Sequence, residues 1–201
     1  MKKTCLLIII VLTRCGVFAQ QAPDVRPLMD SVFQKEAGLF VEVHPFSVVW
    51  LEERDTMDYR LLLKDHHFEI DHALLIELIH RCAHPDTTSW TQEEVKKHIL
   101  VDSSDDYINP KKVIHGWGLV DKGAGEKLRR AIRRYNDPGP YDRYIYHVSR
   151  PVIDHTGSYA VVCEGFSWGP GEEKVCPSSA LLFHFDGQSW NKIGDLEHVV
   201  Y

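Results

Sequence analysis

The last third of the chain constrains the fold most, because short apolar runs alternate there with turn signals. The runs are rich in aromatic and β-branched residues, a composition typical of strands. They are Tyr144–Val148, Tyr159–Cys163, Ala180–Phe185 and Trp190–Ile193. Two turn sequences, at residues 154–157 and 186–189, each contain a glycine that can adopt a positive φ. This spacing predicts an antiparallel meander sheet over residues 144–201.

The region from residue 71 to residue 135 is predicted to be rich in helices. Asp71 can cap a helix whose apolar residues recur at helical spacing until Pro85 ends it. Thr91-Gln92-Glu93-Glu94 has the form of a capping box, and Trp90 and Val95 flank it at the positions of a hydrophobic staple. Residues 126–135 carry apolar side chains on one helical face, with Arg129, Arg130, Arg133 and Arg134 spread over the other side. We interpret these arginines as a solvated helix face.

The segment before residue 71 is predicted to contain a helix and then extended chain. Asp24 can cap a helix that Gly38 ends. Residues 39–52 are rich in β-branched and aromatic side chains but are interrupted by Pro45, which predicts a strand or hairpin at about 39–52. The expected fold class is therefore α+β, with N-terminal helices, this strand or hairpin, and the C-terminal sheet in a single domain over residues 20–201.

Residues 1–19 have the three parts of a signal peptide. Lys2 and Lys3 precede an apolar run from Cys5 to Leu12, and Ala19 ends a cleavage-site sequence. The run is too short to span a bilayer, so no stable transmembrane segment is expected after processing. A lipid anchor at Cys15 is the alternative, although Arg14 stands where lipidation motifs have a small residue. We expect an exported protein that is periplasmic, in the cell envelope or secreted.

The charge of the mature chain excludes one class of partner. Removal of the leader takes away three cations, which changes the formal net charge from −6 to −9. Affinity for nucleic acid depends on clustered Lys and Arg that displace counterions, so no nucleic-acid partner is expected. The sequence contains no phosphate-binding loop of a nucleotide-binding protein and no Gly-x-Ser-x-Gly motif of a serine hydrolase. No cofactor is expected.

Three cysteines remain after processing. Cys163 and Cys176 flank a turn-rich stretch, and we predict a disulfide between them, because export favours such bonds. Cys82 then lies within an apolar helix as a small buried side chain. Phe166 and Trp168 lie between the paired cysteines and are candidate binding residues for a protein, peptide or glycan. Burial of these aromatic residues against the sheet is the alternative.

Histidine and carboxylate residues offer several candidate sites, none with a specific motif. No metal site is favoured; the alternative set is Glu77, His80 and His84, which fall at helical spacings of three and four. Asp102, Asp105, Asp106 and Asn109 lack the glycine and distal glutamate of an EF-hand loop, so we interpret them as capping residues. A catalytic arrangement of Ser149 or Ser167 with a distant histidine also remains open.

Parts of the predicted sheet resemble a known group of proteins. The resemblance is carried by residues 147–154 with their Ser149-Arg150-Pro151-Val152 sequence, by residues 157–162, and by residues 181–193. This pattern is similar to that of small uncharacterised exported proteins of Bacteroidetes, over about the last 60 residues. Cys176-Pro177 departs from the Cys-Gly pair that such proteins hold in the loop. Since that group has no assigned activity, the resemblance implies export and fold only.

The function expected from the sequence is correspondingly general. An exported protein with no catalytic motif is most consistent with a binding or envelope-associated structural domain. The sequence leaves open whether the protein is an enzyme. The alternative function is that of a metal-dependent hydrolase that uses a His/carboxylate cluster.

Overall fold

The computed structural model describes residues 24–34, 40–52, 69–95, 98–105, 107–110, 122–137, 144–168 and 175–198. The predicted signal peptide and the predicted helix stop at Gly38 lie outside these residues. The helical elements are α1 (Arg26–Gln34), the 3₁₀ turn η1 (Val49–Leu51), α3 (His72–Arg81), α4 (Gln92–Val95) and α6 (Lys122–Asn136). The strands are β1 (Phe40–Glu42), β2 (Ile99–Val101), β3 (Tyr144–Val148), β4 (Val152–Ile153), β5 (Tyr159–Trp168), β6 (Val175–Phe185) and β7 (Trp190–His198).

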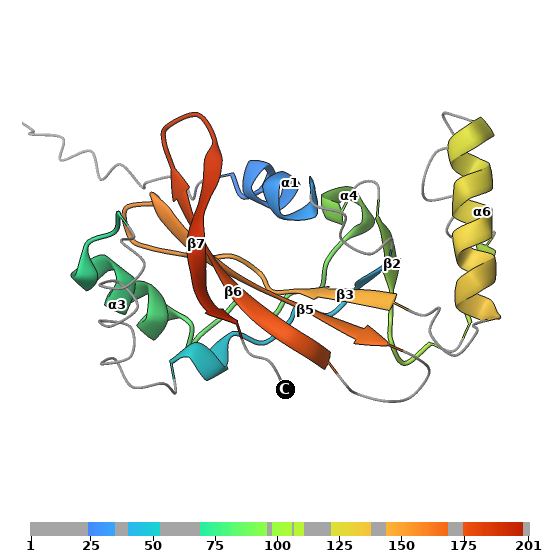
Figure 1. Ribbon diagram of the computed structural model, residues 1–201, viewed down its shortest axis with the longest axis horizontal. Coiled ribbons are helices and arrows are strands. Elements are labelled where there is room, and N and C mark those ends of the chain that lie inside the picture. Colours follow the sequence, from blue (N-terminus) through green and yellow to red (C-terminus); the bar gives the residue numbers. More distant parts are fainter. Residues whose placement is uncertain are drawn as a thin grey trace, which may run out of the picture.

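The described strands form one mixed sheet of seven strands in the order β2-β1-β3-β5-β6-β7, with β4 paired to β5. β1 runs parallel to both β2 and β3, and the other neighbouring pairs are antiparallel. The protein is thus a mixed α/β structure whose C-terminal half is rich in sheet (Figure 1). Strands from the N-terminal half join the same sheet, so helices and sheet are less separated along the chain than the sequence suggested.

The prediction of a strand or hairpin at about 39–52 was wrong for most of that segment. Only Phe40–Glu42 is a strand, and the chain turns into η1 seven residues later. Pro45 lacks the N–H needed to continue pairing on both edges. Val48 and Leu51 are fully buried in the cluster that α3 covers. The apolar side chains of this segment therefore pack with α3 and do not form a hairpin.

The helix starts predicted from capping residues are confirmed. Asp71 is the N-cap of α3, and its carboxylate accepts a hydrogen bond from the Ala73 N–H at 2.7 Å. The capping box before α4 forms as well: Glu94 Oε2 accepts from the Thr91 N–H at 2.9 Å, and the Glu94 N–H donates to Thr91 Oγ1 at 3.4 Å. Trp90 and Val95 are both buried in one cluster, as expected of the staple.

α1 and α6 agree with the periodicity of their sequences. α6 buries Leu128, Ile132 and Tyr135 against β1, β2 and β3. Its four arginines are exposed, as expected of a solvated helix face. α1 buries Leu28, Met29 and Val32 in the cluster that also holds Trp90.

The core is divided between the two faces of the sheet. α1 and α4 cover one face, where side chains such as Tyr146 and Val162 are buried. α3 and η1 cover the β5–β7 part of the opposite face, and α6 covers its β2–β1–β3 part (Figure 1). Ile145 belongs to the cluster under α6 and pairs with Ser167, whereas Cys163 belongs to the cluster under α3 and lies four residues before Ser167 on β5. Side chains an even number of residues apart on a strand point to the same face, so both clusters lie on the same face of the sheet.

Arg150 connects the first face to the capping box. Its side chain is 9% exposed and pairs with Glu94 through Nη1 and Nη2. Arg150 also donates to two backbone carbonyls, from Nε to Thr88 O at 2.9 Å and from Nη2 to Ser89 O at 2.7 Å. The guanidinium lies 3.8 Å from the centre of the Trp90 ring.

Candidate functional site

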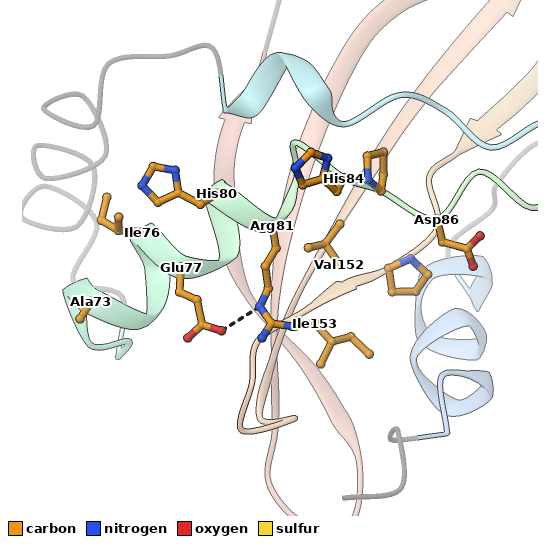
Figure 2. Close-up of a pocket in the computed structure, with 11 residues that line it drawn as sticks. Ala73, Ile76, Glu77, His80, Arg81, His84, Asp86, Val152 and Ile153 are labelled. Carbon is orange, nitrogen blue, oxygen red and sulfur yellow. Dashed lines mark hydrogen bonds and ion pairs between the residues drawn. The ribbon is translucent and has the colours of Figure 1, made fainter. Parts of the chain in front are cut away.

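A pocket of about 690 Å³ lies between α3 and the short strand β4. Its apolar lining comes from α3 and from the segment of β4, through Ala73, Ile76, Pro151, Val152 and Ile153 (Figure 2). Pro85 and the polar residues Glu77, His80, Arg81, His84 and Asp86 complete it. The site therefore combines an apolar surface with charged and imidazole side chains supplied almost entirely by one helix and the loop after it.

Glu77 is the most constrained polar group of the pocket. Its carboxylate accepts hydrogen bonds from Arg81 Nε at 2.8 Å and from the His155 N–H at 3.0 Å, and it also contacts His155 Nδ1. Partial burial raises the pKa of Glu77, but the hydrogen bonds from His155 and the positive charge of Arg81 outweigh that effect and leave the pKa lowered. The carboxylate is therefore ionised at neutral pH and already bound within the protein.

Arg81 joins the helix to the strand. It points toward Glu77 (Figure 2), and its Nη1 donates to the Ile153 carbonyl at 3.1 Å. The side chain is nevertheless 47% exposed. A guanidinium has five N–H donors, and these two contacts use two of them. Arg81 is thus a cation that is both positioned and accessible.

The three residues of the alternative metal set line one pocket, but their ligand atoms do not converge on one point. His80 Nδ1 lies 3.9 Å from Glu52 and is directed away from the Glu77–Arg81 pair, as is His84 (Figure 2). Among the described residues, the group whose ligand atoms all lie within 4.8 Å of one another is Glu42, His44 and Asp102. Glu77, His80 and His84 therefore line a pocket without forming a coordination site in this arrangement.

Phe166 does not lie in a loop, because β5 continues through Trp168. Its ring is partly buried against the core and lies 4.7 Å from the Tyr144 ring and 4.9 Å from the Tyr146 ring, between ring centres. For Phe166 the alternative of burial against the sheet therefore describes the structure better than an exposed anchor. The side chain of Trp168 and the segment 169–174 lie outside the described residues.

The predicted disulfide is not supported by the register of β5 and β6. Cys163 lies opposite Ala180, and Cys176 lies opposite Phe166. The two cysteines are offset by three to four residues, or about 10–13 Å along the strands, whereas disulfides need Cα atoms within about 7 Å. The bond stays a prediction that would require these strands to slip. Cys82 is fully buried, and burial raises the pKa of its thiol to about 12.

The two serines considered for catalysis have different environments. Ser149 is buried, and its Oγ accepts the Cys163 N–H at 2.8 Å, which is a structural contact between the residue after β3 and strand β5. Ser167 Oγ lies 2.8 Å from His147 Nε2. Burial lowers the pKa of His147, with Glu42 opposing the shift. Among the described side chains none hydrogen-bonds the other ring nitrogen of His147, which is the contact that orients a catalytic base.

Comparison with protein-family models, with curated proteins and with solved structures finds no match. None of the described helices has the length and apolar character required to cross a membrane.

Sequence reasoning found the helical half of the pocket but not its other wall. The spacing of Glu77, His80 and Arg81 on one helix was visible in the sequence. The contact of that helix with Ile153 joins residues 72 positions apart. No local signal predicts such a contact, and Pro151 and Ile153 were for that reason missed as site residues.

Proposed function

We propose that the protein is an exported binding domain whose ligand occupies the pocket between α3 and β4. The observation that carries this proposal is an apolar surface beside an accessible, fixed guanidinium, in a pocket of about 690 Å³. Ligand sites of proteins have volumes of about 300–1,000 Å³ and combine apolar walls with a few polar groups. Export follows from the signal-peptide pattern of residues 1–19.

The chemistry of the pocket favours a peptide-like ligand with a carboxylate. Arg81 is 47% exposed and has the planar set of N–H donors that suits a carboxylate. Ile76, Val152 and Ile153 supply contacts for an aliphatic side chain. No Phe, Tyr or Trp is among the described residues that line the pocket, so it lacks the aromatic platform on which sugars stack. Within the partner classes expected from the sequence, a peptide or protein segment thus fits better than a glycan.

We expect N-acetyl-L-leucine to bind this pocket at millimolar concentration. Its aliphatic side chain can pack on Ile153, and its carboxylate can accept hydrogen bonds from Arg81. In an NMR titration, the amide signals of Ile76, Val152 and Ile153 should shift. Arg81→Gln should weaken binding about 10-fold, because it removes a charge-assisted contact worth about 1.5 kcal/mol.

Two controls make this test specific. N-acetyl-L-leucinamide has the same shape without the charge, and we expect it to bind at least about 10-fold more weakly. Arg26→Gln removes an exposed arginine elsewhere on the surface and should leave binding unchanged. Equal shifts with the acid and the amide, or shifts that lie outside α3 and β4, would contradict the proposed site.

The export proposal makes a separate prediction about the N-terminus. Intact-mass measurement on protein from the exported fraction should show the loss of residues 1–19 and a chain that begins at Gln20. A lipid anchor would instead give a chain that begins at Cys15 with the added mass of acyl groups. Retention of Met1 in that fraction would contradict cleavage of either kind.

A metal-dependent hydrolase is the second candidate function. It no longer draws on Glu77, His80 and His84, because the first of these is bound to Arg81 and His155. The observation in its favour is a different group of two carboxylates and one imidazole, which lies on another part of the sheet.

A further inference from the structure

Two neighbouring parallel strands end beside three side chains of the types that can bind a metal. Glu42 is the last residue of β1 and pairs in register with Val101, the last residue of β2. Asp102 follows directly, and His44 lies two residues after Glu42. One ligand atom from each of Glu42, His44 and Asp102 lies within 4.8 Å of the others. The carboxyl ends of parallel strands are a common place for ligand sites in α/β sheets.

Glu42 is a buried carboxylate that is held by hydrogen bonds from the backbone. It is 4% exposed, and its oxygens accept hydrogen bonds from the Ser103 N–H at 2.8 Å and the His44 N–H at 3.3 Å. No Lys or Arg among the described residues makes an ion pair with it. Buried charges in proteins are paired or coordinate a metal, so a carboxylate in this environment is suited to hold a cation.

The other two ligands are positioned and open to solvent. His44 Nε2 lies 3.8 Å from Asp102 Oδ2. The second oxygen of Asp102 accepts hydrogen bonds from the Ser104 N–H at 2.9 Å and from Ser104 Oγ at 2.6 Å, which orient the carboxylate. The side chains of His44 and Asp102 are 65% and 38% exposed, so an ion can enter from the solvent side.

We propose that Glu42, His44 and Asp102 form a binding site for a Zn²⁺ ion. One imidazole nitrogen and two carboxylate oxygens are ligands that zinc accepts, and three protein ligands leave a fourth position for water or a substrate. Calcium prefers six to eight oxygen ligands and fits this set less well. The site shares no residue with the pocket between α3 and β4, so it holds or fails independently of the proposed binding function.

The test is calorimetric titration of the full mature chain with Zn²⁺ after removal of metal by a chelator. We expect one equivalent to bind with micromolar or tighter affinity. His44→Ala and Asp102→Asn should each weaken that binding by at least about 10-fold. The double variant His80→Ala/His84→Ala removes two other exposed histidines and should leave it unchanged. Ca²⁺ should not compete at equal concentration.

Two further measurements separate loss of the site from loss of the fold. Zn²⁺ should raise the thermal midpoint of the wild type but not that of His44→Ala, whose midpoint without metal should match the wild type because the side chain is mostly exposed. Co²⁺ bound at the site should give visible absorption bands that Asp102→Asn weakens. The proposal is overturned if the wild type binds no Zn²⁺, or if only the His80/His84 variant loses binding.

Discussion

Replacing Arg150 with alanine should lower the free energy of unfolding by about 3–5 kcal/mol. The substitution removes the cationic partner of Glu94, whose side chain is only 31% exposed. It also leaves the Thr88 and Ser89 carbonyls without their donor and uncovers the Trp90 ring. Breaking a buried ion pair from one side is costly because the remaining charge stays in a poorly solvated place.

Urea denaturation followed by circular dichroism measures this effect, and two variants provide controls. Arg26→Ala breaks an exposed pair with Asp24 and should change stability by less than about 1 kcal/mol. Arg150→Lys keeps the charge but loses the planar set of donors, so its stability should fall between those of the wild type and the alanine variant. A loss below about 1 kcal/mol for Arg150→Ala would show that the network contributes little.

Acidification should destabilise the protein through Glu94 by about 3 kcal/mol. Hydrogen bonds from Arg150 lower the pKa of Glu94 to about 2, against partial burial that opposes the shift. Because the folded-state pKa lies below the ordinary value of 4.5, the carboxylate stabilises the fold fully above about pH 4.5. That contribution should decline as the pH falls from about 4.5 to about 2. Each unit of difference between the folded and the unfolded pKa corresponds to about 1.4 kcal/mol.

Stability measured against pH in the wild type and in Glu94→Gln isolates this group from other acids. Asp86, Asp102 and Asp154 also have lowered pKa values, chiefly through hydrogen bonds in the first two, and will contribute in both proteins. The stability difference between wild type and variant should therefore shrink between about pH 4.5 and pH 2. A difference that stays constant across this range would contradict the role given to Glu94.

The predictions that succeeded depended on contacts between residues close in sequence. The capping box of Thr91 and Glu94, the N-cap Asp71 and the exposed arginines of α6 all involve spacings of four residues or fewer. Gly187 adopts a φ of +94° in the turn between β6 and β7, as its place in the turn sequence indicated. Such features are set by backbone geometry within a few residues, which the sequence displays directly.

The expected loop around Phe166 was wrong, and the reason is where strands pair. Phe166 was expected in a loop, but its pairing with Tyr146 on one side and Cys176 on the other extends β5 past it. The same register offsets Cys163 from Cys176 along the strands, and the disulfide between them stays a prediction. Strand register is decided by which faces of distant segments are buried together, and a turn-rich sequence of glycines does not reveal where pairing stops.

The sequence by itself determined the helices, their caps and their buried faces, together with the sheet-rich character of the last third. Only the tertiary structure decided that β1 and β2 join that sheet in parallel, which brings Glu42 and Asp102 together from positions 60 residues apart. It also decided that Glu94, which belongs to the capping box before α4, forms an ion pair with Arg150. Helix signals are local because their hydrogen bonds close within four residues, whereas parallel pairing joins segments that share no local signal.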